Sequence, residues 1–220
     1  MVIAIDGPAG SGKTTIGRMV AQALGFAVVD TGLFYRAVTV EARRRGIKPD
    51  DATALTTMIE SMRIDINTDP IGQGPQVRVD GRDVSAKAQD PAIATDLSRI
   101  SQVAAVRRLL VDGQRGAARG NAVVLGRDIG TVIFPDADVK FFFTAPAAER
   151  VARRRRELDL VRGTSTPDAL LEQEIEARDR ADQEREMGPL RPAADAIILA
   201  TEGKSVQEVF TEVMGRLPKH

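Results

Sequence analysis

The stretch Gly7-Pro8-Ala9-Gly10-Ser11-Gly12-Lys13-Thr14 decides the interpretation of this chain. It matches the pattern G-x-x-x-x-G-K-[ST], which binds nucleotide phosphates when it lies between a strand and a helix. The apolar run at 2–5 predicts a buried strand before it, and apolar residues at helical spacing over 13–24 predict a helix after it. We therefore expect a phosphate-binding loop rather than a glycine-rich turn that carries a chance lysine.

The loop residues have distinct expected roles. Glycines allow backbone N–H groups to point inward around phosphates, and the following helix adds the positive end of its dipole. The Lys13 ammonium would reach the β- and γ-phosphates, and the Thr14 hydroxyl can ligate a Mg²⁺ ion held mainly by phosphates and water. The expected nucleotide-binding residues are Gly7, Pro8, Ala9, Gly10, Ser11, Gly12, Lys13, Thr14 and Thr15. GTPases, motors and regulators carry such loops too, so the loop alone does not predict a reaction.

Short apolar runs flanked by helical segments predict the core of the fold. Buried runs that alternate with helices indicate a parallel sheet covered on both faces. We expect an α/β fold of the P-loop NTPase type, a doubly wound sheet of about five parallel strands, within one domain spanning 1–220. The expected strands are 2–5, 27–30, 122–125, 139–143 and 196–199.

Two stretches interrupt this rhythm. Residues 63–86 alternate as in a strand pair, with Asp80-Gly81 as the hairpin turn, and Pro70, Gly72, Gly74 and Pro75 mark a loop before it. Arg153 to Pro167 is polar and basic, which predicts a mobile flap between two helices. We expect a core at about 1–30, 91–149 and 164–220, an acceptor-binding region with a β insert at about 31–90, and a lid at about 150–163.

Composition excludes several classes of chemistry. The chain has 31 basic and 31 acidic residues, whereas a protein that coats nucleic acid is usually basic. It has no cysteine, and His220 is its only histidine, which excludes thiolate chemistry, a Ser-His-Asp triad and a histidine zinc site. Phosphoryl transfer remains, because positioning and charge stabilisation can drive it. No apolar run could span a bilayer and no secretory signal is visible, so we expect a cytoplasmic protein with no membrane partner.

Six segments, in order over nearly the whole chain, form a recognisable set. They are Gly-Pro-Ala-Gly-Ser-Gly-Lys at 7–13, Asp-Thr-Gly-Leu-Phe-Tyr-Arg at 30–36, Val-Asp-Gly-Arg-Asp-Val-Ser at 79–85, Ser-Gln-Val-Ala-Ala at 101–105, Gly-Arg-Asp-Ile-Gly-Thr-Val-Ile-Phe-Pro at 126–135 and Pro-Ala-Ala-Asp-Ala at 192–196. This set resembles the bacterial cytidylate kinase family of nucleoside monophosphate kinases. The resemblance implies transfer of the ATP γ-phosphoryl group to CMP and dCMP, with Mg²⁺, to give CDP and dCDP.

The resemblance also implies roles for individual residues. The implied catalytic residues are Lys13, Arg127, Asp128, Arg178 and Arg185, and Arg153 and Arg154 belong to the lid over ATP. The implied CMP-binding residues are Thr31, Tyr35, Arg36, Ser101, Arg107, Arg127, Asp128, Arg178, Asp182 and Arg185. The chain is about three residues shorter than some relatives after Ala105, which makes Arg108 an alternative to Arg107. Leu125 stands where relatives often carry an acid.

Residue chemistry supports these roles but leaves alternatives open. Arginine forks bind phosphate oxygens, and an arginine with a carboxylate complements the carbonyl and amino groups of cytosine. Without the resemblance, Thr31 could be a helix N-cap, 178–185 a solvated salt-bridge face, and 153–156 a solvated basic helix. Rival functions are a kinase of another small acceptor, such as shikimate, and a regulator without catalysis. The expected Asp-x-Asp of shikimate kinases is absent after the second strand. We expect a monomer whose partners are small-molecule nucleotides, without a nucleic-acid polymer.

Overall fold

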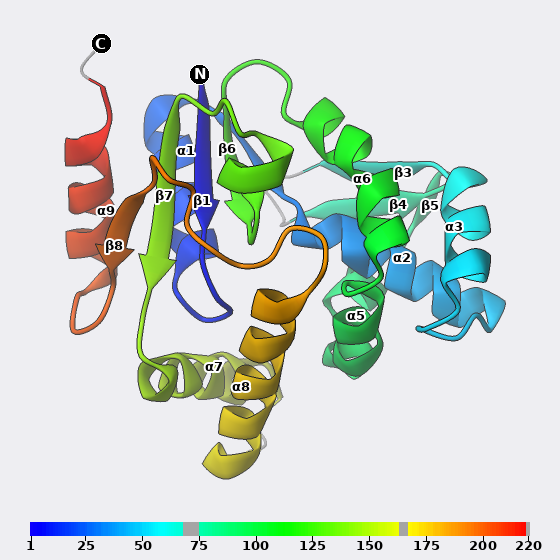
Figure 1. Ribbon diagram of the computed structural model, residues 1–220. Coiled ribbons are helices and arrows are strands. Elements are labelled where there is room, and N and C mark those ends of the chain that lie inside the picture. Colours follow the sequence, from blue (N-terminus) through cyan, green and yellow to red (C-terminus); the bar gives the residue numbers. More distant parts are fainter. Residues whose placement is uncertain (68–74, 163–166, 219–220) are drawn as a thin grey trace.

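A five-stranded parallel sheet forms the centre of the computed structural model, which describes residues 1–67, 75–162 and 167–218 (Figure 1). The strand order is β2-β6-β1-β7-β8, and every neighbouring pair is parallel. The strands are β1 (Val2–Asp6), β2 (Ala27–Asp30), β6 (Ala122–Gly126), β7 (Val139–Thr144) and β8 (Ile197–Ala200). The predicted doubly wound α/β fold is confirmed, and the last strand begins one residue later than expected.

Helices pack on both faces of this sheet. On one face, α1 (Lys13–Leu24) and α9 (Val206–Arg216) bury Ile16, Val20, Val209 and Val213 against the strands. On the other face, α6 (Ala104–Ala117) and the π-helical turn η2 (Ile129–Ile133) cover Ala4 and its neighbours in β2 and β6. The inner strand β6 is apolar along its whole length because both of its faces are buried.

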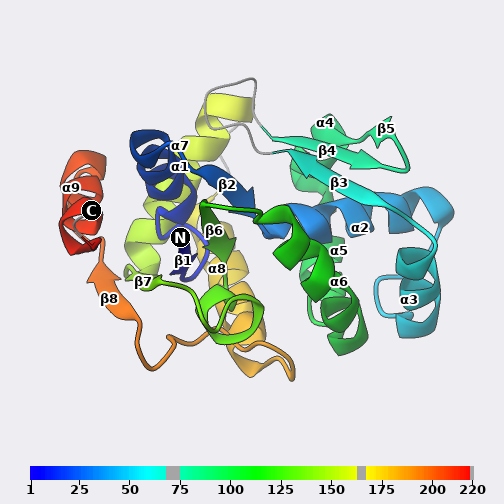
Figure 2. The same cartoon turned by 90° about the horizontal axis from the view of Figure 1, so that it is seen from above.

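The segment between β2 and β6 forms a second body beside the sheet. In the view from above, this body lies on one side of the molecule and α9 lies on the other (Figure 2). Its α2 (Gly32–Arg45) packs against both the helical and the β parts of this region. The helical elements are α2, α3 (Ala52–Glu60), α4 (Ser85–Gln89), the short 3-10 turn η1 (Pro91–Ile93), α5 (Ala94–Ile100) and α6.

The predicted β insert is confirmed as a small antiparallel sheet. Asp80 and Gly81 both have positive φ, 51° and 77°, as a two-residue hairpin turn requires. The sequence predicted a strand pair, but the sheet has a third strand, since β3 pairs with β4 over Ile64–Asn67. Its strands are β3 (Ile64–Asn67), β4 (Gln76–Val79) and β5 (Arg82–Asp83). The expected loop residues Pro70, Gly72 and Gly74 lie outside the described residues.

The basic stretch that follows β7 is helical up to Arg162, so the prediction that the segment from Arg153 lies between two helices is wrong over 153–162. The lid at about 150–163 stays a prediction. Helix α7 (Ala147–Arg162) continues through it, and α8 (Asp168–Glu184) packs against α7. No helix breaker interrupts 147–162, and Glu149 pairs with Arg153 one turn later. Residues 163–166 lie outside the described part of the chain. None of the helices in the described ranges is long and apolar enough to cross a membrane.

Candidate active site

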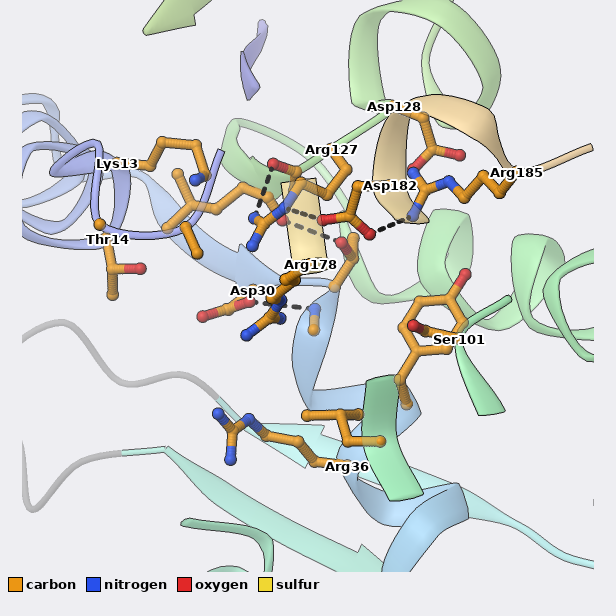
Figure 3. Close-up of a pocket in the computed structure, with 18 of the residues that line it drawn as sticks. Lys13, Thr14, Asp30, Arg36, Ser101, Arg127, Asp128, Arg178, Asp182 and Arg185 are labelled. Atoms are coloured by element: carbon orange, nitrogen blue, oxygen red, sulfur yellow. Dashed lines mark hydrogen bonds and ion pairs between the residues drawn. The ribbon is translucent and has the colours of Figure 1, made fainter. Parts of the chain in front are cut away.

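A cavity of about 260 Å³ lies where the carboxyl ends of β1, β2 and β6 meet. Loops that follow neighbouring parallel strands open on the same edge of a sheet, which is where such folds bind ligands. We call it the central cavity (Figure 3). Its lining residues are Ala9, Gly10, Lys13, Thr14, Asp30, Thr31, Gly32, Tyr35, Arg36, Leu97, Ser101, Arg107, Leu125, Gly126, Arg127, Asp128, Arg154, Arg178, Asp182 and Arg185.

The phosphate loop forms one end of the central cavity. Gly7 has φ of 146°, and a Cβ there would lie 2.4 Å from the Phe143 carbonyl oxygen, so only glycine fits where the loop leaves β1. Lys13 donates to the Pro8 carbonyl at 2.6 Å and to Ser11 Oγ at 3.4 Å. Burial lowers the pKa of the Lys13 ammonium well below its ordinary value, and the Arg127 guanidinium lowers it further. A phosphate group would supply the counter-charge that this end of the cavity needs.

Two arginines and an aspartate converge beside the loop. Arg127 donates to Asp182 Oδ2 at 3.0 Å, and Arg178 lies next to them (Figure 3). Burial lowers the pKa of Arg178 to about 10, and Arg127 contributes to this, so Arg178 is still charged at neutral pH. Burial opposes ionisation of Asp182, but Arg127, Arg178 and Arg185 together hold its pKa below the ordinary value. The cluster carries more cations than anions, which suits phosphate binding.

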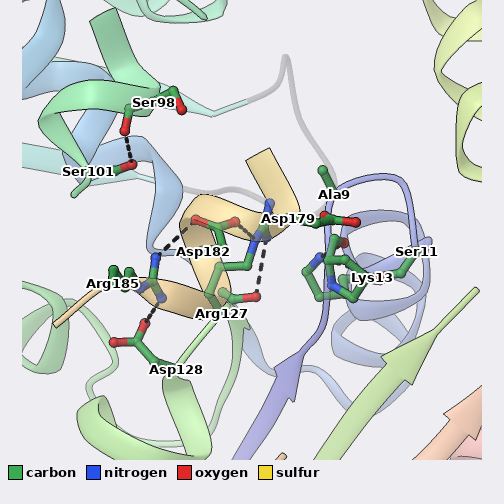
Figure 4. A network of polar contacts seen from close by, with 12 residues as sticks. Ala9, Ser11, Lys13, Ser98, Ser101, Arg127, Asp128, Asp179, Asp182 and Arg185 are labelled. Atoms are coloured by element: carbon green, nitrogen blue, oxygen red, sulfur yellow. Dashed lines mark hydrogen bonds and ion pairs between the residues drawn. The ribbon is translucent and has the colours of Figure 1, made fainter. Parts of the chain in front are cut away.

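At the other end, Asp128 stands between two buried arginines. Arg107 Nη2 donates to Asp128 Oδ2 at 2.6 Å. On the other side, Arg185 Nη2 lies 3.5 Å from Asp128 Oδ1 (Figure 4). Arg107 also lies over the Tyr35 ring at 5.2 Å and donates to the Ser101 carbonyl at 3.2 Å. Among the described residues, Arg185 Nη2 makes no hydrogen bond although it is buried. A donor and a carboxylate thus face the same cavity, as a ring with a carbonyl and an amino group requires.

The first turn of α2 forms the remaining wall. Thr31 Oγ1 donates to the Leu125 carbonyl at 2.9 Å, which fixes the start of α2 against the end of β6. Arg36 donates to the Ala88 carbonyl in α4 at 2.7 Å, and burial lowers its pKa while Asp30 raises it. Thr31 occupies the N-cap position of α2, as the alternative interpretation expected, but its side chain makes no cap hydrogen bond.

Comparison with known proteins identifies the family of this chain. The sequence profile of the family described as "Cytidylate kinase" matches residues 3–219. This chain belongs to the cytidylate kinase family. A "Cytidylate kinase" from Pelotomaculum thermopropionicum is 43% identical over 98% of this chain and 95% of its own length. One from Symbiobacterium thermophilum is 40% identical over 97% and 94%. A "Bifunctional pantoate ligase/cytidylate kinase" from Prochlorococcus marinus is 44% identical over 95% of this chain, which spans only 43% of that longer protein.

The structure gathers the whole set of CMP-binding residues that the family resemblance implied, since all of them line the central cavity. Of the pair left open by the sequence, Arg107 is 2% exposed and lines the cavity, whereas Arg108 is exposed. The face shared by Arg178, Asp182 and Arg185 also lines the cavity, so it is not a solvated salt-bridge face. Leu125 packs against Gly17 in α1, where a Cβ would lie 2.4 Å from its side chain.

The expected ATP-binding residues divide into two groups. Ala9, Gly10, Lys13, Thr14 and Arg154 line the central cavity. The others do not line it: Gly7, Pro8, Ser11, Gly12, Thr15 and Arg153.

Arg153 has partners of its own. It donates to the Thr201 carbonyl at 2.9 Å and pairs with Glu149 at 2.5 Å. Arg155 pairs with Asp168. Arg153 also donates to the Gly10 carbonyl of the phosphate loop at 3.3 Å, and its role in ATP binding stays a prediction.

Sequence reasoning missed other residues that shape the site. Asp30 and Gly32 line the cavity, and Asp30 Oδ1 accepts a hydrogen bond from the Gly32 N–H at 3.0 Å. Gly188 abuts Asp128 so closely that a Cβ would lie 1.9 Å from Asp128 Oδ2. Glycine followed by Pro189 after a helix is a turn signal in the sequence, but nothing in it indicates this contact across 60 positions.

The cavity fits a magnesium ion carried in by a nucleotide. No group of three or more His, Cys, Asp or Glu residues arranged for a metal occurs in the described residues. Mg²⁺ usually keeps several waters and binds phosphates with only one or two protein oxygens. The Thr14 hydroxyl, exposed at the start of α1 and lining the cavity, is such an oxygen.

Proposed function

We propose that this chain transfers the γ-phosphoryl group of ATP to CMP and dCMP, giving ADP with CDP or dCDP. One observation carries the proposal: a single cavity holds the Lys13 ammonium at one end and the Arg107–Asp128 pair at the other. Figure 3 shows Lys13 and Asp128 on opposite sides of it. Asp128 can accept from the cytosine amino group while Arg107 donates to its carbonyl. Uracil would place a second carbonyl against Asp128, and a buried polar site rejects such a mismatch.

Charge stabilisation would perform the reaction. The transferring phosphoryl group spreads negative charge over its oxygens, so preorganised cations lower the barrier. Lys13, Arg127, Arg178 and Arg185 take this role, with Arg154 reaching the cavity from α7. The acceptor phosphate is already anionic, so it needs no dedicated base. Mg²⁺, held by the nucleotide phosphates and the Thr14 hydroxyl, would neutralise part of the charge when bound.

Two rival functions predict different behaviour. A kinase of another small acceptor would not need a donor and a carboxylate side by side at the far end of the cavity. A regulator without catalysis would not need the acceptor-side arginines, because binding one nucleotide uses the loop alone. We also infer a monomer, because residues of one chain line the whole cavity. We infer a cytoplasmic location because its substrates are small-molecule nucleotides.

An ADP-release assay with ATP, Mg²⁺ and a panel of acceptors tests the proposal. The panel is CMP, dCMP, UMP, AMP, GMP and shikimate. We expect kcat/KM for CMP and dCMP to exceed that for UMP by about 10-fold or more, the cost of one opposed buried polar contact. Equal efficiency with UMP would refute the assignment of the base, and no transfer to any nucleotide would refute the kinase. Gel filtration with light scattering measures the oligomeric state.

A further inference from the structure

Asp6 is a buried carboxylate to which the proposed mechanism gives no task. It is the last residue of β1, directly before Gly7, and only 4% of it is exposed. Asp6 Oδ1 accepts a hydrogen bond from the Ile129 N–H, and Asp6 Oδ2 accepts one from the Gly130 N–H, both at 2.8 Å. Each oxygen thus holds a separate backbone group of the η2 turn.

The η2 turn begins immediately after Arg127 and Asp128. The Val132 and Ile133 N–H groups donate to the Asp128 carbonyl at 2.8 and 3.2 Å, which ties the π-helical turn to the residue before it. At its far end, Arg115 donates to the carbonyls of Ile133 at 2.8 Å and Val132 at 3.1 Å. The end that carries Asp128 is held to the sheet by Asp6.

Keeping a carboxylate at this position is costly. Burial raises the pKa of Asp6 to about 6, and the Asp128 carboxylate pushes in the same direction. The two N–H groups and the Lys13 ammonium oppose the rise. An apolar side chain would continue the buried strand without that cost. A carboxylate is useful here because it can accept from two adjacent N–H groups at once, which an amide or hydroxyl oxygen cannot do in the same geometry.

We propose that Asp6 is a positioning residue of the acceptor site, which fixes Arg127 and Asp128 relative to the phosphate loop through the backbone of Ile129 and Gly130. This inference rests on the proposed function. Because Asp6 adjoins Gly7, one residue links the strand that starts the donor loop to the turn that carries the acceptor contacts. Its hydrogen bonds go to the acceptor side alone, and toward the donor it acts only through the attraction between its charge and Lys13. Its loss should therefore disturb acceptor binding more than donor binding.

Asp6→Asn tests the inference. Asparagine keeps the size of the side chain but replaces one acceptor oxygen by an NH₂ group, which would face a backbone N–H. Asp138→Asn is the matched control: Asp138 Oδ2 accepts from the Val2 N–H at 2.6 Å, at the opposite end of the same strand and far from the cavity. Both variants and the wild type are assayed at about pH 8, where Asp6 is ionised.

We expect kcat/KM for CMP to fall about 10- to 100-fold in Asp6→Asn, because a misplaced contact group carries a penalty of this size. The preference for CMP over UMP falls with it, and KM for ATP stays within about 2-fold of the wild type, as uniform donor binding is untouched. Asp138→Asn keeps all wild-type constants.

Three results would overturn the inference: acceptor constants equal to those of Asp138→Asn, an equal rise in both KM values, or a lower kcat with both KM values unchanged. If Asp6→Asn does not fold, Asp6→Ser decides, since the smaller hydroxyl brings no NH₂ group and can accept from only one of the two N–H groups. It should raise KM for CMP and spare KM for ATP, and unchanged acceptor kinetics would overturn the inference. A wild type without CMP activity would instead refute the proposed function.

Discussion

A methyl group at position 188 would collide with the carboxylate that we assign to base recognition. Gly188 has φ of 63°, and its hypothetical Cβ lies 1.9 Å from Asp128 Oδ2 and 3.0 Å from Arg107 Nη2. The backbone has little freedom to retreat, because the Gly188 carbonyl accepts from Arg185 Nε at 2.5 Å. The next turn is held as well, since the Leu190 N–H donates to the Asp182 carbonyl at 2.7 Å. In Gly188→Ala, Asp128 must therefore leave Arg107.

The structure allows the size of this effect to be worked out. Alanine in the left-handed region costs about 1–2 kcal/mol wherever it occurs. Separating Asp128 from Arg107 adds about 1.5–3 kcal/mol, the usual value of a hydrogen bond to a charged group. In a chain of this size 1 kcal/mol shifts Tm by about 2–4 °C, so we expect Gly188→Ala to lower Tm by about 10 °C. The lost contact corresponds to a fall in kcat/KM for CMP of about 10- to 100-fold.

Gly120→Ala is the matched control. Gly120 has φ of 75°, and nothing lies within 4 Å of its hypothetical Cβ. It precedes β6, at the end of the strands opposite to the cavity. This variant should lose about 2–8 °C of Tm from strain alone and keep its activity. Thermal melts and the ADP-release assay measure both quantities. Equal Tm and equal kcat/KM for the two variants would show that Gly188 does not hold Asp128 in place.

Three further predictions concern other parts of the molecule. Lys13→Ala should lower kcat by at least about 100-fold with an unchanged circular dichroism spectrum, because it removes a cation from the site of developing charge; near-normal kcat would contradict its role. Hydrogen bonds from Arg44, and then from Arg82 and Arg45, hold the pKa of Glu41 well below its ordinary 4.5, although the burial of Glu41 acts in the opposite direction. The stability that the ionised Glu41 contributes is therefore present above pH 4.5 and is lost as the pH falls below that value. Glu41→Gln should therefore lower Tm by about 5 °C at neutral pH and flatten the acid side of the Tm profile, and an unchanged profile would refute the coupling. The Arg150–Asp179 ion pair and the Arg153–Thr201 hydrogen bond already hold the start of α7, so the part that ligands can order is 154–162. Hydrogen exchange of the backbone amides there should slow only when ATP and CMP are both bound. Equal protection with and without both nucleotides would contradict a ligand-gated lid.

The core of the fold could be predicted because its signals are local. The five strands are apolar runs, and the motif from Gly7 to Thr14 predicts a strand before it and a helix after it. The Asp80-Gly81 turn likewise predicts its hairpin from two residues. The third strand of the insert, β3, was not predicted because no turn signal links it to β4, which follows several residues later. The end of α7 was predicted too early because its basic residues are also typical of loops.

The site was predictable only in part, for a different reason. Residue chemistry alone could not separate a ligand-binding face from a solvated one at 178–185, since both contain arginine and aspartate at helical spacing. The contacts of Asp6 with Gly130 and of Gly188 with Asp128 span 124 and 60 positions, and no local pattern reports them. Such contacts follow from the packing of the whole chain.

The long segment between β2 and β6 leaves the central sheet at one strand and returns to it at the neighbouring strand. The Thr31 N–H donates to the Leu125 carbonyl at 3.0 Å, and the Ala27 N–H donates to the Asn121 carbonyl at 3.1 Å, so the two strands stay zipped whatever lies between them. The entropy of closing such a detour grows only slowly with its length. Residues 32–103 are therefore the replaceable part of this detour, whereas α6 has to stay because it covers one face of the central sheet. A protein engineer could shorten, lengthen or replace this module to accept a different monophosphate while leaving the ATP-binding loop in its original frame.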